Sequence, residues 1–313
     1  MSLRIVFCGT PAFAVPTLRH LIAQPGFHIE SVITQPDRPR GRNQEILVSP
    51  VKAAAIEAGI PVYQPEKIKS EDAQVFLKRV TPDIVVIIAY GQIISRPLIE
   101  IPRLGWINLH GSLLPRYRGA APINWAIANG ETHTGLTTMQ VDAGLDTGPI
   151  LLKHEIDIGP HETAPELAAR LAESGAPLVT ETLQKLAREG ITATPQDDSQ
   201  ATFAPLLKKE DGKIDWSLAA QKIYNRIRGL QPWPGAFTSF RGKNCHVWGR
   251  PVTQQPLYAE PGTLSAQGQD FRVACGETTA LRLESVQLEG RKRVSAREFA
   301  NGARLVPGER FLY

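Results

Sequence analysis

Short apolar runs alternate with helix-like segments along the first 190 residues of this 313-residue chain. Runs rich in Val and Ile, each ended by Gly, Thr or Ala, predict β-strands at 3–9, 28–34, 83–89 and 106–111. Segments with apolar residues every three or four positions predict helices at 11–23, 49–59 and 70–80. This alternation predicts an α/β fold built on a doubly wound, mostly parallel sheet.

Local signals refine these elements. Ser49, with the proline after it, predicts the start of the second helix, because serine caps helix N-termini and proline is tolerated in the first turn. Gly59 predicts the end of that helix. Residues 134–141 and 148–158 have the pattern of two hairpin strands, and 164–188 has the pattern of one long helix.

The pattern changes after this long helix. Residues 190–207 have little periodicity and predict a linker between a first domain, 1–189, and a second domain, 208–313. The second domain should begin with a helix at 217–230. Short strands separated by glycine turns are expected at 236–240, 243–249, 271–276 and 280–288. Such spacing favours a small barrel or a sandwich.

Charge is divided unevenly between the two expected domains. Residues 208–313 carry 17 Lys and Arg against 10 Asp and Glu, whereas residues 1–207 carry 18 against 21. A basic domain beside a slightly acidic one suggests a docking surface for a polyanion. A solvated basic face without a partner explains the same numbers.

Composition narrows the class of protein. The chain is 42% hydrophobic and 21% charged, and it has neither a signal-peptide pattern nor an apolar run long enough for a membrane span. Cys8, Cys245 and Cys275 lie far apart and have no metal-ligand spacing. We therefore expect buried free thiols in a reducing cytoplasm, no bound metal and no membrane partner.

Functional side chains are expected beyond the carboxyl ends of the strands, where open α/β sheets bind ligands. The loops after Gly9, Ala89 and His110 should converge there. The first of these, GTPAFA at 9–14, lacks the G-x-G-x-x-G pattern of dinucleotide sites. Its free backbone N–H groups fit either an anion site or a tight turn.

Asn108 and His110 share one face of the strand at 106–111, because side chains alternate along a strand. No nucleophilic serine or cysteine of the usual kind accompanies them, but Asn can stabilise an oxyanion and His can donate a proton. A buried His–Asn pair is also common as plain structure. Asp146 lies between Gly144 and Gly148, where a close backbone approach is expected, and near His110 it would orient the ring and favour its charged form. This set suits acyl transfer to an amine that the substrate itself brings.

Two stretches, NLHGSLLPRYRGAAPINWAI (108–127) and DAGLDTGPI (142–150), resemble the folate-dependent formyltransferases. SLLP recurs across that family. QPDRPRGR (35–42) and LQPWPGAF (230–237) are more specific and resemble the branch that acts on methionyl-tRNA. The likeness begins at FCGTPAFA (7–14) and continues into the basic C-terminal domain. It implies a Rossmann-like formyltransferase fold followed by an OB-like β-barrel.

The resemblance implies transfer of the formyl group of 10-formyltetrahydrofolate to the α-amino group of methionyl initiator tRNA, giving formylmethionyl-tRNA for translation initiation. Asn108, His110 and Asp146 would be the catalytic residues. The α-amine would attack the formyl carbon, Asn108 and His110 would stabilise the oxyanion, and His110 would protonate the leaving N10. The implied folate site comprises Ala89, Tyr90, Gln92, Ile93, Ile94, Ser112, Leu113, Leu114 and Pro115.

The same resemblance assigns the basic residues to tRNA. Arg38, Arg40 and Arg42 lie in a Pro/Gly loop that, in the family, wedges against the acceptor arm. Family loops usually continue with lysines, whereas this loop reads GRNQEIL and contains Glu45. In the second domain, the candidates for phosphate contacts are Lys208, Lys209, Lys213, Lys243, Arg291, Lys292 and Arg293.

Three other functions would use some of the same residues. An amino-sugar formyltransferase would keep the catalytic trio and SLLP, but it needs neither an arginine loop nor a basic barrel and often carries a dehydrogenase domain. A folate hydrolase would use water and commonly has a regulatory domain. A non-catalytic RNA-binding protein would not need the intact trio. We therefore expect the tRNA enzyme, acting as a monomer.

Overall fold

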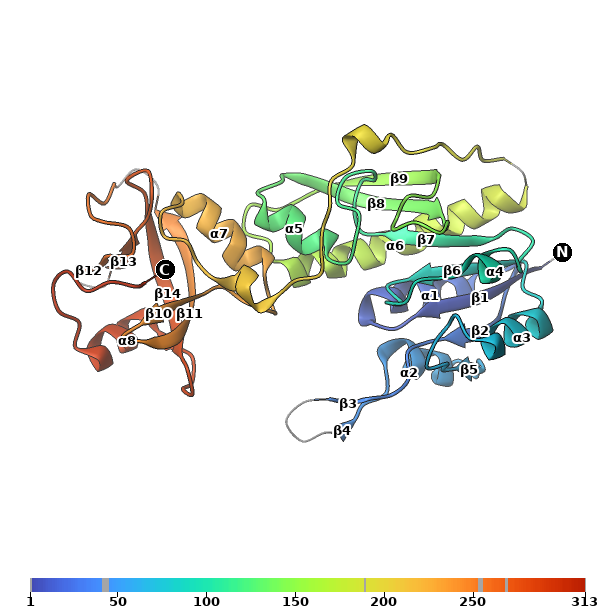
Figure 1. Cartoon of the computed structure of the whole chain (residues 1–313), viewed down its shortest axis with the longest axis horizontal. Coiled ribbons are helices and arrows are strands. Elements are labelled where there is room, and N and C mark those ends of the chain that lie inside the picture. Colours follow the sequence, from blue (N-terminus) through green and yellow to red (C-terminus); the bar gives the residue numbers. More distant parts are fainter. Residues whose placement is uncertain (1, 41–44, 189, 253–255, 268–269, 313) are drawn as a thin grey trace. The chain divides into compact units, whose positions relative to one another are not determined.

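The computed structural model describes residues 2–40, 45–188, 190–252, 256–267 and 270–312 (Figure 1). Contacts divide the chain into two compact units. The first comprises Met1–Pro122, His133–Asp157 and Leu167–Pro205, and the second comprises Ile123–Thr132, Ile158–Glu166 and Leu206–Tyr313. No helix in the described part of the chain is long and apolar enough to cross a membrane.

A seven-stranded sheet forms the centre of the first unit. Its strand order is β5 (Val62–Tyr63), β2 (Phe27–Ile33), β1 (Leu3–Gly9), β6 (Ile84–Ile88), β7 (Trp106–His110), β8 (His133–Gln140) and β9 (Ile150–Asp157). The strands from β5 to β7 pair in parallel, while β8 and β9 form an antiparallel hairpin added at one edge. The predicted parallel sheet and the predicted hairpin strands are confirmed.

Helices cover both faces of this sheet. On one face, α3 (Glu71–Val80) and α4 (Arg96–Ile99) share an apolar cluster with Trp106 of β7. On the other face, α6 (Ala164–Ala187) lies against Leu109 of the same strand. The sheet is therefore doubly wound, as predicted.

The other helices and strands up to residue 212 are η1 (Ala12–Ala14), α1 (Val15–Ala23), β3 (Pro39–Arg40), β4 (Glu45–Ile46), α2 (Pro50–Glu57), α5 (Pro122–Ala128), η2 (Asp198–Gln200) and η3 (Lys209–Gly212).

The limits of α2 follow the sequence signals. Ser49 Oγ accepts a hydrogen bond from the Lys52 backbone N–H at 3.2 Å, and Pro50 occupies the first turn. Gly59 follows the last turn with φ = +69°, a conformation that glycine adopts without strain. The predicted start and end of this helix are confirmed.

A polar cluster fixes the base of the loop that contains the predicted arginines. Lys52 Nζ pairs with Asp37 and also donates to Gln64 Oε1 at 2.7 Å. Gln64 Nε2 donates in turn to Asp37 Oδ1 at 3.0 Å and to the Gln35 carbonyl oxygen at 2.8 Å. The hydrogen bond from Lys52 holds the pKa of Asp37 below its usual value.

An antiparallel sheet forms the second unit. It consists of β10 (Phe237–Phe240), β11 (Lys243–Val252), β14 (Ala280–Leu288), β13 (Asp270–Ala274) and β12 (Leu264–Gln267), with β15 (Val294–Ser295) paired to β14. Two helices, α7 (Ala220–Gly229) and α8 (Ala296–Ala303), bury apolar side chains in the same core as these strands.

Residues near the C-terminus close this sheet into a barrel-like domain. Leu312 bridges Ser239 on the edge strand β10, and Arg310 bridges Thr263 just before β12, so both edges gain a partner. Phe311 lies between them and is 1% exposed in the core. The barrel-like architecture is confirmed. The sequence did not predict β12 or β15, because these strands are short, nor α8, in which Asn301 and Gly302 weaken the helical pattern.

The segment expected to be a linker, 190–207, is attached to the first unit over much of its length. The Arg118 backbone N–H donates to the Thr202 carbonyl oxygen at 2.8 Å. Thr194 exchanges two backbone hydrogen bonds with Ile150 at the start of β9. Contacts therefore group residues up to 205 with the first unit, and the domain limits at 189 and 207 stay a prediction.

Replacing Asp37 by asparagine should lower the free energy of unfolding by about 1 kcal/mol at pH 7, because Lys52 loses its charged partner. A lowered pKa adds stability above the ordinary value of 3.8 and loses it as the pH falls through the lowered value. The difference from wild type should therefore shrink as the pH falls below 3.8. Urea unfolding across this range measures it.

The matched control is Glu173→Gln, at an exposed position of α6. It should match wild type at each pH. A deficit of Asp37→Asn that does not change with pH would contradict the role given to the charge.

Candidate active site

Three strand ends meet where the sequence predicted a ligand site. Gly9 pairs with Ile88 and Ile87 pairs with Asn108, so β1, β6 and β7 end side by side. A cavity of about 170 Å³ lies at these ends. It is lined by Ile87, Gln92, Ile93, Ile94, Asn108, Met139, Val141, Asp142, Ala143, Gly144, Leu145 and Asp146.

Asn108 reaches this cavity from β7. It shares a strand face with Trp106 and His110, as the alternation of side chains requires. Within the part of the chain that the structure describes, its amide group forms no hydrogen bond, so its N–H groups are available to a ligand. A fixed N–H donor of this kind stabilises negative charge that develops on a carbonyl oxygen.

His110 lies behind the cavity wall and is 5% exposed. Its Nε2 atom is 2.9 Å from the Tyr117 carbonyl oxygen. A carbonyl oxygen only accepts, so Nε2 carries a hydrogen. Nδ1 lies 3.6 Å from Asp146 Oδ2, which is a second acceptor. The ring thus lies between two acceptors, the Tyr117 carbonyl oxygen and the Asp146 carboxylate.

Asp146 connects His110 with the cavity, since it contacts the ring and also lines the wall. Its φ of +54° is in the left-handed region, which few residues other than glycine adopt. Its Oδ2 accepts the Gly119 backbone N–H at 2.8 Å. At Gly148, a Cβ atom would overlap the carbonyl oxygen of Gln140. The close backbone approach predicted around Asp146 is therefore confirmed at Gly148.

Arg118 and Gln196 hold the Asp146 loop in place. Gln196 Nε2 donates to the carbonyl oxygens of Asp146 and Gly148, each at 2.8 Å. Its Oε1 accepts from Arg118 Nε at 3.0 Å and Nη2 at 2.8 Å. Arg118 is 4% exposed and also pairs with Asp198 at 2.7 Å.

Sequence reasoning missed both Arg118 and Gln196. Gln196 lies in the segment expected to be a linker, where neither a period nor a motif marks it. Arg118 lies in PRYRGAAP, shortly after β7, but this stretch does not mark it, because Arg116 two residues earlier is exposed.

The predicted folate residues of the loop after β6 divide into two groups. Gln92, Ile93 and Ile94 line the cavity, and Ile93 is 79% exposed. Ala89 and Tyr90 are not part of the lining. The Tyr90 ring is buried, and this burial raises the pKa of its hydroxyl. Their contact with folate stays a prediction.

The predicted SLLP stretch is packed within the first unit. The Ser112 hydroxyl donates to a backbone oxygen four residues later at 2.6 Å. Leu114 is fully buried, and its backbone N–H donates to Thr137 Oγ1 at 3.1 Å. Leu113 and Pro115 are half-buried. None of these four residues lines the cavity, and their folate role stays a prediction.

The structure describes only part of the loop that contains Arg38, Arg40 and Arg42. Arg38 is exposed and forms an ion pair with Glu66 at 3.1 Å. Arg42 and the side chain of Arg40 lie outside the described residues. The proposed contact of these three arginines with tRNA stays a prediction.

The basic candidates of the second unit differ in their surroundings. Arg293 stacks over the Trp248 ring at 3.9 Å and donates from Nε to Ser285 Oγ at 2.7 Å. Arg291 and Lys292 line a pocket. The remaining candidates are all exposed: Lys208, Lys209, Lys213 and Lys243.

No metal centre is evident in the described part of the chain, which holds no group of three His, Cys, Asp or Glu placed for a metal ion. The predicted buried free thiols are confirmed for Cys8, Cys245 and Cys275. Burial raises the pKa of Cys245 and of Cys275 to about 12. Thiols that hold their protons so firmly do not act as nucleophiles at neutral pH.

Replacing Gln196 by methionine should release the Asp146 loop and leave the Arg118 guanidinium short of an acceptor. We expect a loss of about 2 kcal/mol in the free energy of unfolding. Amide hydrogen exchange should also become faster in residues 142–150. Gln200→Met is the matched control, because Gln200 is exposed and its amide contacts only Asp197. Equal exchange in the two variants would show that Gln196 does not hold the loop.

Comparisons with known proteins agree with this architecture. A formyl transferase family model matches residues 3–183, and a model of the formyl transferase C-terminal domain matches residues 206–304. The chain is 54% identical to the methionyl-tRNA formyltransferase of Solibacter usitatus, with 98% of each chain covered. It is 52% identical to that of Koribacter versatilis, with 96% of each covered.

Solved structures share the fold at much lower sequence identity. An N-formyltransferase from Helicobacter canadensis, in complex with folinic acid and dTDP-3-aminofucose, has a TM-score of 0.66 and is 17% identical, with 90% of this chain and 98% of that chain covered. Identity near one half over almost the whole length is far more specific than this likeness of fold. The chain belongs to the methionyl-tRNA formyltransferase family.

Proposed function

We propose that this chain transfers the formyl group of 10-formyltetrahydrofolate to the α-amino group of methionyl initiator tRNA, and so forms formylmethionyl-tRNA for translation initiation. Its family membership over nearly the full length supports these substrates. The observation that carries the chemistry is that Asn108 and Asp146 line one cavity, with His110 directly behind Asp146. We also propose that the enzyme works as a monomer in the cytoplasm.

The residues of the cavity fit a folate donor. Ile87, Ile93, Ile94 and Leu145 supply apolar walls, and Asn108 is among the few polar groups. An apolar slot with few, well-placed polar groups suits a flat heterocycle with polar edges. When bound, 10-formyltetrahydrofolate supplies the formyl group to be transferred.

Asn108 is proposed to stabilise the charge that forms during transfer. As the methionyl α-amine attacks, the formyl oxygen gains negative charge, and the amide of Asn108 donates a hydrogen bond to it. The amine must be uncharged to attack, so a nearby group has to hold its proton. The Asp146 carboxylate lines the cavity and can take that proton.

His110 and Asp146 are proposed to act as one proton-transfer unit. Asp146 lines the cavity and His110 does not, so protons exchange with the substrates through the Asp146 carboxylate. His110 Nδ1 lies 3.6 Å from the Asp146 carboxylate, so a proton can pass between the two side chains, while Nε2–H stays bound to the Tyr117 carbonyl oxygen. The pair then returns a proton to the nitrogen that leaves.

His110→Ala and Asn108→Ala should each lower kcat for formyl transfer to methionyl initiator tRNA by about 100- to 1000-fold, because Asn108 stabilises the developing charge and His110 belongs to the proton-transfer unit. Single-turnover assays with 10-formyltetrahydrofolate measure the rate. His154→Ala, at an exposed position of β9, is the matched control and should keep wild-type activity. Full activity of either catalytic variant would contradict the assigned site.

The acceptor is tested separately by offering the wild-type enzyme charged initiator tRNA, a nucleotide-linked amino sugar, or water alone. We expect rapid transfer to the tRNA and little to the others. Preferential transfer to the amino sugar or to water would leave the catalytic residues in place and refute the tRNA substrate.

A further inference from the structure

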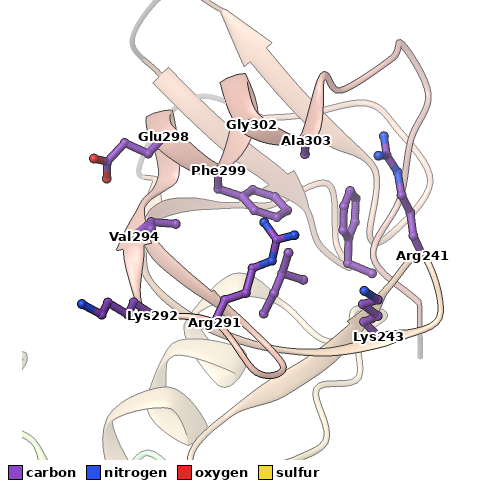
Figure 2. A pocket seen from close by; sticks show the side chains of 11 residues that line it. Arg241, Lys243, Arg291, Lys292, Val294, Glu298, Phe299, Gly302 and Ala303 are labelled. Carbon is purple, nitrogen blue, oxygen red and sulfur yellow. The ribbon is translucent and has the colours of Figure 1, made fainter.

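The barrel-like unit contains a second cavity, which we call the barrel pocket. It has a volume of about 450 Å³, within the roughly 300–1,000 Å³ that ligand pockets occupy. It opens between the β10–β11 turn, the chain around β15, and α8 (Figure 2). Its apolar floor is formed by Phe240, Leu288, Val294, Phe299 and Ala303.

Three cations on the rim of the barrel pocket have no acidic partner. Lys243, Arg291 and Lys292 form no ion pair with any described residue, and all three are exposed. Figure 2 shows the Arg291 side chain extending toward Phe299. A cation that extends over an apolar floor, with two further unpaired cations on the rim, suits an anionic ligand that also has an apolar face.

The other charged residues of the barrel pocket are already engaged. Arg241 pairs with Glu309, which lowers the pKa of that carboxyl, and it lies 4.9 Å from the Phe240 ring centroid. Glu298 completes the N-terminal capping box of α8 by accepting from the Ser295 backbone N–H at 2.8 Å. The Glu298 carboxylate is thus directed to the helix start, and the open part of the pocket keeps an excess of positive charge.

We propose that the barrel pocket receives one unstacked nucleotide of the tRNA substrate. The base lies on the apolar floor, and the neighbouring phosphates contact Lys243, Arg291 and Lys292. This inference rests on the proposed function, because it takes tRNA as the substrate. Contact with a duplex backbone needs only cations, whereas an apolar slot of this size beside them is suited to a base.

Gly302 offers a way to fill the barrel pocket without changing its charge. It lines the pocket on α8, and a Cβ atom there would meet no atom within 4 Å. Leucine forms helices better than glycine, so Gly302→Leu should fold, and thermal unfolding checks this. Gly302→Ala adds one methyl group and is the matched control.

Binding of uncharged initiator tRNA to the full-length protein, measured by fluorescence anisotropy at several salt concentrations, tests the proposal. Gly302→Leu should weaken binding by about tenfold, as expected when one stacked base is lost, and should leave the salt dependence unchanged. Arg291→Ala should weaken binding. It should also reduce the slope of log Kd against log salt by about 1, the change expected for the loss of one phosphate contact. Lys78→Ala, at an exposed position of α3, and Gly302→Ala should bind like wild type.

Formyl-transfer assays distinguish a failure of the barrel-pocket proposal from a failure of the proposed function. For Gly302→Leu we expect a raised KM for methionyl initiator tRNA with unchanged kcat and unchanged KM for the folate. If wild type and Gly302→Leu bind tRNA equally well and formyl transfer is intact, the proposed nucleotide binding in the barrel pocket is refuted and the proposed function stands. The pocket would then be free for another ligand, such as an acidic peptide. If wild type fails to formylate methionyl-tRNA, the proposed function itself fails.

Discussion

The backbone of Asp146 is held in a conformation that most residues avoid, and the strand ends around the cavity of the first unit are organised around it. A left-handed φ at a residue with a side chain costs energy, so its neighbours must compensate. Asp146 Oδ2 accepts from Gly119 and faces His110, while its carbonyl oxygen accepts from Gln196. The segments around His110, Gly119 and Gln196 thus meet at this one residue.

This arrangement explains why the chain returns to the first unit after its long helix. Gln196 reaches Asp146 only because the segment around it runs beside the loop after β7, where Thr202 receives the Arg118 backbone N–H. Arg118 is buried, and its guanidinium keeps acceptors from that same segment. A stretch without regular structure thus helps to hold the backbone of Asp146, the carboxylate that we propose takes part in catalysis.

Much of this fold could be predicted from local pattern, and much of the site could not. Some features depend on residues close in sequence and can therefore be predicted from local pattern. They include the strand ends, the Ser49 cap and the glycine at Gly148. The Arg118–Gln196 pair joins positions 78 residues apart through polar groups, which produces neither a period nor a motif. Helix α8 was missed for another reason: Ser295 and Glu298 have the spacing of a capping box, but Asn301 and Gly302 weaken the helical pattern that follows.

The way the barrel closes also sets an order of events during synthesis. Thr238 on β10 bonds to Leu312, 74 residues later, so the two edges of the barrel gain their shared partner only when that segment has been made. Until then, β10 and β12 present unpaired backbone groups to whatever is near. On a crowded polysome, the neighbour most often at hand is another nascent copy with the same two open edges. An incomplete barrel is therefore exposed to strand pairing between chains until its last residues are made.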